Sequence, residues 1–385
     1  MNSSKSVIVV ISNFPFPAHH GGSFDVFERI VGLKNLGFNI DIICTCKDQP
    51  NPKHIEYMHT LVDDVFIVKR ENKFSQLFHV SPLQVVSRKA LKSFIFKKAY
   101  HYAILETEHV GLVLKNETFI AQKIFLRLQN NESYYFKQLA KSTNNILEKI
   151  YYLSDAVKFK FYSKKIFNKA DRLWFISNEE IKSKQKNKAY LPKSAHLPSP
   201  INSEFIRQKL DNKNILYIAS LSMPNNIEAL DWYLKNIHSK LLLEFPDYKL
   251  IVVGSIDVSE INSIKDKYST CNGIEINFNV PDLNHFYSTC SLFINPMQHG
   301  AGVKLKTINA MVNGLPIVST SVGAEGIGLI EKEMFFLGNS ENEFYDKIYD
   351  YFRLDNSERH RSIDKAQHFL RQNNYLSILK DELVQ

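Results

Sequence analysis

Residues 296–326 read PMQHGAGVKLKTINAMVNGLPIVSTSVGAEG, and they form the most specific pattern in the chain. An apolar run over 292–294 predicts a strand before this stretch, and the glycines at 300 and 302 predict a loop that opens a helix over 304–313. Lys304 and Lys306 stand at the start of that helix, where the helix dipole repels cations unless an anion neutralises them. The pattern therefore predicts a polyanion site, with a diphosphate as the leading candidate.

Apolar runs alternate with helical or irregular stretches along the rest of the chain, as in parallel sheets that are covered on both faces. The runs that predict strands lie at 7–11, 40–44, 65–68, 103–105, 124–128 and 173–176, and then at 215–219, 250–253, 274–278, 292–294 and 317–318. Two Rossmann-like sheets in tandem are the simplest account of these two series. We therefore expect an α/β protein that binds its ligands at the carboxyl ends of the strands, in a cleft between two sheets.

The length and the composition agree with two domains. The chain has 385 residues, of which 44% are hydrophobic and 23% charged, as is typical of globular proteins. Prolines at 192, 198 and 200 predict a hinge over 196–213, between an N-terminal domain over 1–195 and a C-terminal domain over 214–365. The apolar runs are too short for a transmembrane helix or a signal peptide, so we expect a cytoplasmic protein. The cysteines at 44, 46, 271 and 290 lack metal-ligand spacing and are expected to be reduced.

Positive charge is concentrated in the N-terminal half. Residues 1–200 hold 30 Lys and Arg against 17 Asp and Glu, whereas residues 201–385 hold 18 against 23. Residues 158–169 interleave lysines with aromatic and aliphatic residues, so this segment could dock on anionic lipid at the inner membrane face. The alternatives are an amphipathic helix that packs on its own domain, and a nucleic-acid-binding module, for which no motif is present. The lysines of this membrane or acceptor surface are Lys158, Lys160, Lys164 and Lys165.

A second glycine loop lies near the N-terminus. His19, His20, Gly21 and Gly22 follow the run at 7–11 and precede an amphipathic stretch over 24–36. Glycines there would let the backbone approach an anion at the start of the helix. The loop lacks both the GxGxxG and the Walker patterns, so a purely structural turn is the alternative.

Residues 300–320 resemble the donor-binding signature of retaining GT-B glycosyltransferases of family 4, written GxGx(R/K)xKxxEAMAxGxPVVxT. Other stretches that resemble this family lie at 170–177, 219–232, 245–254 and 280–283, and in the loop with Gly21 and Gly22. The resemblance implies a GT-B fold, with two Rossmann-like domains facing across a cleft and a C-terminal helical segment over about 366–385 that packs back on the N-terminal domain. It also implies a transferase that moves a sugar from a nucleotide-sugar donor to a glycan or lipid-linked acceptor in cell-surface polysaccharide biosynthesis, with retention.

The same resemblance implies roles for individual residues. Lys304 and Lys306 would contact the donor diphosphate, and the backbone of Gly300 and Gly302 would face the donor. The donor would be of UDP or GDP type, and no metal would be required, because cations and backbone dipoles stabilise the leaving diphosphate. The remaining positions that the resemblance implies for the donor site are Gly21, Gly22, Ser220, Val280 and Asn309.

Two positions depart from the family pattern. Asn309 replaces the acidic residue that grips the ribose hydroxyls, so the charge-assisted hydrogen bond is lost. Gln129 replaces the His of an RxHNxE segment beside the donor sugar, and glutamine cannot exchange a proton near neutral pH. Glu325 is the nearest remaining carboxylate, either as a sugar contact or as a loop residue that caps the next turn. The departures leave a second hypothesis open, a catalytically impaired GT-B homologue that acts as a partner or scaffold protein.

Overall fold

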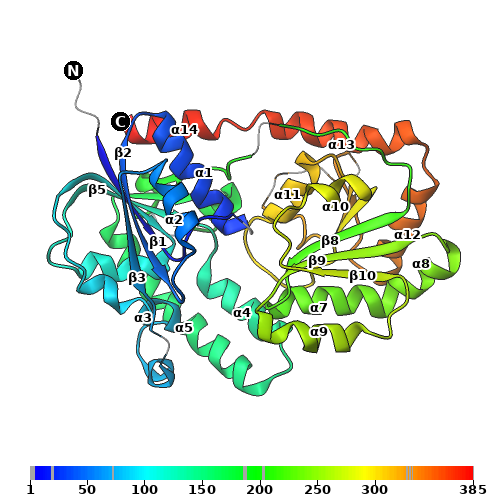
Figure 1. Cartoon of the computed structure of the whole chain (residues 1–385), viewed down its shortest axis with the longest axis horizontal. Helices are drawn as coiled ribbons and strands as arrows, with labels where there is room; N and C mark the ends of the chain where they lie inside the picture. The colour runs from blue at the N-terminus through cyan, green and yellow to red at the C-terminus, as the bar shows by residue number, and fades with distance from the viewer. Residues whose placement is uncertain are drawn as a thin grey trace. The chain divides into compact units, whose positions relative to one another are not determined.

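The computed structural model describes residues 5–18, 21–71, 73–184, 189–201, 204–326, 328, 331 and 333–384. The chain folds into two compact units (Figure 1). Unit 1 comprises Met1–Ala140, Leu147–Pro200 and Asn374–Gln385, and unit 2 comprises Lys141–Ile146 and Ile201–Asn373. Each unit has its own sheet and its own core.

In the described part of unit 1, seven strands form one parallel sheet in the order β3-β2-β1-β4-β5-β6-β7. The central strands are buried on both faces, which explains why their sequences are nearly continuous apolar runs. The strands are β1 (Ser6–Ile11), β2 (Asn39–Cys46), β3 (Asp64–Lys69), β4 (Tyr100–Glu106), β5 (Ala121–Leu128), β6 (Arg172–Phe175) and β7 (Ser194–His196).

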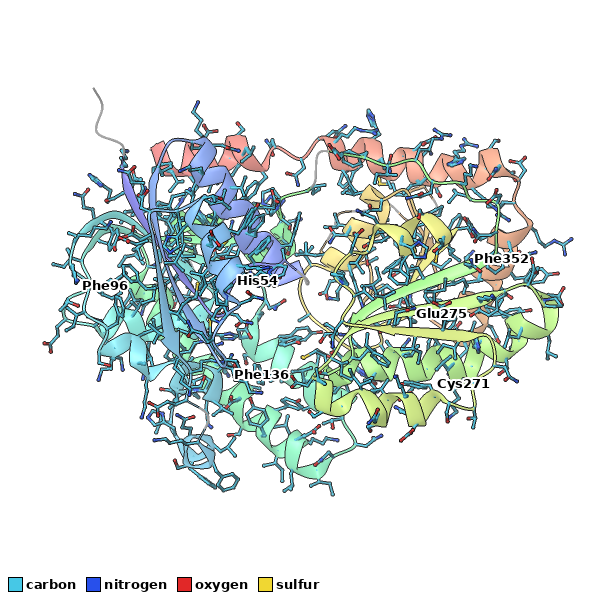
Figure 2. The ribbon with its side chains drawn as sticks, in the orientation of Figure 1. His54, Phe96, Phe136, Cys271, Glu275 and Phe352 are labelled. Atoms are coloured by element: carbon cyan, nitrogen blue, oxygen red, sulfur yellow. The ribbon has the colours of Figure 1, made fainter. Side chains whose placement is uncertain are left out.

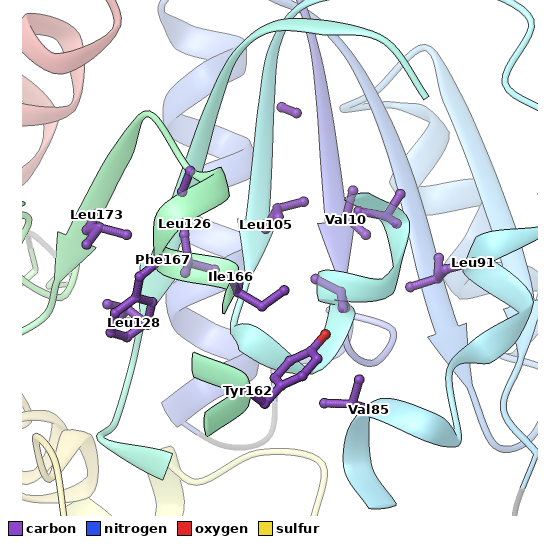
Figure 3. Close-up of a cluster of buried hydrophobic side chains, with 14 of the residues drawn as sticks. Val10, Val85, Leu91, Leu105, Leu126, Leu128, Tyr162, Ile166, Phe167 and Leu173 are labelled. Atoms are coloured by element: carbon purple, nitrogen blue, oxygen red, sulfur yellow. The ribbon is translucent and has the colours of Figure 1, made fainter. Parts of the chain in front are cut away.

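Alternate residues of β1 enter two different core clusters, one on each face of the sheet. The first cluster joins Val10 to Tyr162 and Ile166 of α5 (Ile146–Lys169), as Figure 3 shows. The second joins Val9 to residues of α1 (Gly21–Asn35), α2 (Pro52–His59) and α14 (Tyr375–Val384). The other helical elements of unit 1 are η1 (Phe74–Phe78), α3 (Leu83–Val86), η2 (Lys89–Lys92), η3 (Glu108–Lys115), α4 (Glu132–Ser142), α6 (Asn178–Lys184) and η4 (Leu191–Lys193).

Four buried charged residues connect α1 to the strands of unit 1. Arg127 on β5 donates to both carboxylate oxygens of Asp25, across 3.0 and 2.9 Å. Arg29 donates to Asp25, to Glu106 across 2.5 Å and to the hydroxyl of Tyr375 on α14 across 3.1 Å. Burial raises the pKa of Glu106, whereas for Asp25 the two guanidinium groups outweigh burial and hold the pKa below its ordinary value. The network stabilises unit 1 only while all its partners are present.

Unit 2 repeats the plan. Its described residues contain a parallel sheet of six strands in the order β10-β9-β8-β11-β12-β13. The strands are β8 (Asn214–Ser220), β9 (Lys249–Ser255), β10 (Ile274–Phe278), β11 (Leu292–Asn295), β12 (Ile317–Ser319) and β13 (Phe336–Leu337). The helices are α7 (Pro224–Tyr233), η5 (Leu234–His238), α8 (Ser239–Glu244), η6 (Val258–Glu260), α9 (Ile261–Tyr268), α10 (Asn284–Thr289), α11 (Leu305–Val312), α12 (Glu341–Arg353) and α13 (Asn356–Arg371). The two Rossmann-like sheets confirm the predicted α/β fold class.

Two boundaries differ from the sequence analysis. The C-terminal segment consists of two helices with different cores: Ala366 and Leu370 of α13 lie in the core of unit 2, whereas Tyr375 and Leu379 of α14 lie in the core of unit 1. Helix α1 begins at Gly21, so the glycines predicted to form a loop are the first residues of the helix instead. The first turn of a helix needs no intrahelical N–H partner, which makes its start hard to locate from the sequence.

No helix within the described residues is both long enough and apolar enough to cross a membrane. The four cysteines are free thiols, and Cys271, which is labelled in Figure 2 near Glu275 of β10, is the least buried of them. The described residues contain no group of three His, Cys, Asp or Glu side chains arranged to hold a metal ion.

Candidate functional site

The loop between β11 and α11 has the tight backbone that its glycines predict. Gly302 has a φ of +74°, which lies in the left-handed region that favours glycine. A Cβ atom on Gly300 would lie 2.9 Å from Met297 Cε and 3.4 Å from Lys304 Cε. Lys304 is the N-cap residue of α11. The loop therefore brings its backbone and the first lysine to the start of the helix.

Lys304 is nearly buried, with an exposed fraction of 7%. Its Nζ atom donates to the Gly302 carbonyl across 2.6 Å and lies 3.4 Å from Glu325 Oε2. The Glu325 side chain has an exposed fraction of 45%. The ammonium is thus held over the glycine loop, and the carboxylate that the sequence analysis selected lies beside it.

Lys306 is partly buried and lies beside polar and aromatic groups. Its Nζ atom donates to Asn226 Oδ1 across 3.2 Å and lies 5.0 Å from the centre of the Tyr217 ring. Burial lowers the pKa of Lys306 to about 7, and the positive charge of Lys304 adds to the shift. Two lysines that disfavour each other's charge are electrostatically suited to a bound anion.

Buried polar side chains at the carboxyl ends of two neighbouring strands hold the loop in place. Asn295 at the end of β11 donates through Nδ2 to Thr307 Oγ1 across 3.0 Å and to the Gly323 carbonyl across 2.9 Å. Thr320, directly after β12, donates to the Met297 carbonyl across 2.5 Å and accepts from the Gly323 N–H. The sequence analysis missed these residues. Their signal was an Asn and a Thr, each directly at the end of an apolar run.

The first turn of α7 contacts the same loop. His299 Nδ1 lies 2.8 and 3.0 Å from the two carboxylate oxygens of Glu228. Asn225 donates to the His299 carbonyl across 3.5 Å, and its own Oδ1 atom is buried with no hydrogen-bond partner among the described residues. A carboxylate that holds one ring nitrogen fixes the orientation of the imidazole. This pair was also missed, because Glu228 and His299 are far apart in the sequence.

The other positions selected in unit 2 lie around this loop or on the neighbouring strands. Ser220 ends β8, and its carbonyl accepts from Asn226 Nδ2 across 2.9 Å. Asn309 lies on α11, three residues after Lys306, and is half-buried. Val280 follows β10 and packs, half-buried, against the core of unit 2. Asn226 thus connects the end of β8 to Lys306.

The selected residues of unit 1 lie on α1, directly after β5, and on α5. Gly21 and Gly22 open α1, and Gln129 directly follows β5. His19 and His20 lie outside the described residues. Lys160, Lys164 and Lys165 are exposed on α5, whereas Lys158 has an exposed fraction of only 15% and donates to the Leu77 carbonyl across 2.8 Å. The four predicted surface lysines therefore differ in exposure: three are exposed to solvent, and Lys158 is mostly buried.

Comparisons with known proteins agree with this architecture. Residues 212–353 match the family model described as Glycosyl transferases group 1. A 44.6 kDa protein in the cps region of Klebsiella pneumoniae is 35% identical over 353 residues, which cover 90% of each chain. Sucrose-phosphate synthase from Thermosynechococcus elongatus superposes with a TM-score of 0.71 at 14% identity, over 99% of this chain and 98% of that chain. Anabaena HepE in complex with UDP and glucose gives 0.65 at 12% identity, over 98% of both chains. The structural matches show a shared GT-B fold.

Proposed function

Because the chain belongs to the group 1 glycosyltransferases of GT-B fold, we propose that it moves a sugar from a UDP- or GDP-sugar to a glycan or lipid-linked acceptor in cell-surface polysaccharide biosynthesis. The cps-region relative supports the polysaccharide role. The bound UDP of HepE supports a nucleotide diphosphate as the donor's leaving group.

The observation that carries the proposal is the pair of lysines at the start of α11. As the glycosidic bond to the nucleotide breaks, negative charge grows on the diphosphate. The ammonium groups of Lys304 and Lys306, and the N–H groups of the glycine loop and of the helix start, stabilise that charge. This stabilisation needs no metal ion, so we propose transfer without an obligatory metal.

The finer assignments belong to the same proposal. Val280 presents its backbone to the base, Ser220 and Asn309 lie along the nucleotide, and Gly21 and Gly22 approach the phosphates. Gln129 donates a hydrogen bond to the donor sugar, and Glu325 orients that sugar while it also faces Lys304.

Retention of the anomeric configuration rests on the resemblance to family 4. An inverted product linkage, detected by NMR of the anomeric proton, would overturn it.

The alternative is a catalytically impaired homologue that serves as a partner or scaffold. Asn309 and Gln129 favour it, because neither can take the charged or proton-exchanging role of the family residue. The variant Asn309→Glu restores the acid and separates the active enzyme from the scaffold. If the protein is an active enzyme, this variant should differ from wild type in its affinity for the donor. If the protein is a scaffold, the variant should still show no turnover.

The experiment that tests the proposal is calorimetric titration with UDP, GDP and their common sugar conjugates. The variant Lys304→Ala/Lys306→Ala should lose binding, and Lys240→Ala, an exposed lysine on α8, is the matched control. Hydrolysis or transfer of the bound sugar is then measured as the amount of nucleotide that is released. Failure of every nucleotide to bind the wild type would refute the donor site and favour the scaffold.

We also propose that unit 1 contacts the anionic inner face of the cytoplasmic membrane. The buried face of α5 packs on unit 1 through Phe159, Tyr162 and Ile166.

The outer face of α5 carries Lys160, Lys164 and Lys165. Beside these lysines, exposed apolar side chains continue along the helix, namely Leu147, Ile150, Leu153, Val157 and Phe161. Cations beside exposed apolar residues suit an interface with anionic lipid. Unchanged sedimentation with anionic vesicles after Lys160→Glu/Lys164→Glu/Lys165→Glu would contradict this contact.

A further inference from the structure

Unit 1 contains a cationic cavity that the donor site does not use. It has a volume of about 600 Å³ and lies between the segment that follows β3 and the helical elements η2 and η3. Four lysines line it, Lys73, Lys89, Lys92 and Lys115. Among the described lining residues Glu71 is the one carboxylate, so the lining has a net positive charge.

Glu71 is already neutralised by two of these lysines. Its Oε2 atom lies 3.0 Å from Lys89 Nζ and 3.4 Å from Lys73 Nζ. The ammonium groups of Lys89 and Lys73 lower the pKa of Glu71, so this carboxylate stays charged at neutral pH. Lys92 and Lys115 therefore provide positive charge that Glu71 does not offset, and a ligand of this cavity should be an anion.

Gln76 provides a second and independent sign of a ligand. Its side chain lines the cavity and has an exposed fraction of 7%. Its Oε1 atom accepts from the Lys73 N–H across 3.1 Å, but its Nε2 atom is buried with no hydrogen-bond partner in the described structure. A buried donor without an acceptor is costly, and an anionic oxygen in the cavity would satisfy it.

Exposed apolar side chains alternate along the chain with residues that line this cavity. Phe74 and Phe78 of η1 and the nearby Val80 have exposed fractions of 77%, 79% and 87%. The two phenyl rings lie 5.8 Å apart, centre to centre. Lys158 of α5 donates to the Leu77 carbonyl and so holds η1 against the helix that carries the exposed apolar residues. An anion site with an exposed aromatic rim has the chemistry of a lipid headgroup site, since a lipid presents its phosphate and its acyl chains together.

We propose that the cavity binds the phosphate group of an anionic membrane lipid, with Lys92, Lys115 and Gln76 at the phosphate and with Phe74, Phe78 and Val80 in the acyl boundary. The inference rests on the proposed membrane contact of unit 1 and adds a headgroup site to it. It does not depend on the donor site in unit 2. The lipid phosphate lies at the cavity, and α5 provides the broader electrostatic contact.

The test is co-sedimentation of the full chain with vesicles of phosphatidylcholine, alone or mixed with phosphatidylglycerol. Wild type should prefer the mixed vesicles, and Lys92→Ala/Lys115→Ala should reduce that preference about tenfold or more. Gln76→Leu should reduce it in the same direction. The rim variant Phe74→Ser/Phe78→Ser should weaken binding to the mixed vesicles. Lys34→Ala/Lys53→Ala removes the same charge from exposed positions elsewhere on unit 1 and should leave the preference intact.

Three outcomes would overturn the inference. If Lys92→Ala/Lys115→Ala sediments like wild type while the α5 variant does not, the membrane contact stands without the headgroup site. If inorganic phosphate alone displaces the protein from mixed vesicles, and stabilises the rim variant against heat as well as wild type, the cavity takes a soluble anion instead. If wild type sediments with neither vesicle, both the headgroup site and the membrane contact fail, while the nucleotide titration still tests the donor site.

Discussion

Lys306 Nζ donates a hydrogen bond to Asn226 Oδ1 across 3.2 Å, and this contact joins the first turn of α11 to the first turn of α7. Asn226 also donates to the Ser220 carbonyl at the end of β8. One amide thus holds the ammonium at the carboxyl ends of the central strands of unit 2. Lys306 is partly buried there, and its desolvation, together with the positive charge of Lys304, lowers its pKa to about 7.

Nucleotide binding should take up protons through Lys306. The pKa of this ammonium is about 7 without a ligand, and a bound diphosphate raises it, because the opposite charge favours the protonated form. Between the free and the bound pKa values the complex holds more protons, so uptake occurs above about pH 7 and disappears well below it. Titration at about pH 8, in buffers of different ionisation enthalpy, should show a large fraction of one proton taken up per nucleotide.

The control for this titration is Lys306→Arg, since arginine stays charged throughout this range. It should remove the proton uptake even where binding persists. A binding enthalpy for wild type that does not vary with the buffer would contradict the assignment of Lys306 to the diphosphate.

Gly302→Ala should lower both stability and nucleotide affinity. Its φ of +74° makes alanine cost about 1–2 kcal/mol in the free energy of unfolding. Because the Gly302 carbonyl accepts from Lys304, a shift of the loop also moves the ammonium. Gly37→Ala is the matched control: its φ is +82°, a Cβ atom there meets nothing within 4 Å, and it lies in unit 1. It should lose similar stability in urea unfolding and keep the wild-type nucleotide affinity. Equal affinity losses in both variants would refute the local role.

His299 and Glu228 should act as one unit in donor binding. Either alanine variant frees the loop next to Gly300, so we expect each to weaken nucleotide binding by about 1 kcal/mol. The double variant should lose less than the sum, with a coupling energy of about 0.5–3 kcal/mol. Titration calorimetry on the four proteins measures this. Strictly additive losses would mean that the 2.8 Å contact has no role in positioning the loop.

Arg127→Leu should strongly destabilise unit 1. It removes one guanidinium from a site where Asp25, Arg29 and Glu106 remain fully buried, which leaves two carboxylates for one cation. We expect a loss of about 3–5 kcal/mol in the free energy of unfolding. Arg207→Leu breaks an exposed pair with Asp364 and should cost less than about 1 kcal/mol. Similar unfolding midpoints for the two variants would contradict the structural role of the network.

Strands that are buried on both faces, such as β1, were located because they require a continuous apolar run. The partly buried edge strands β3 and β10 were located as well, since each has at least five residues. β7 and β13 were missed. They have three and two residues, too few to show a period, and lie at the edges of their sheets. His196, the first residue of the predicted hinge, is the last residue of β7.

The sequence by itself determined the α/β class, the positions of the main strands along the chain, and the glycine loop with Lys304 and Lys306. These features depend on neighbours within a few residues. The tertiary structure alone decided that Lys306 meets Asn226, that His299 meets Glu228, and that Lys158 holds η1 instead of facing solvent. It also placed Gln76, whose Nε2 atom has no hydrogen-bond partner among the described residues, in a cationic cavity. In the contacts of Lys306, His299 and Lys158, the two partners are 71 to 81 residues apart in the sequence, and only chain folding brings such distant groups within hydrogen-bond distance.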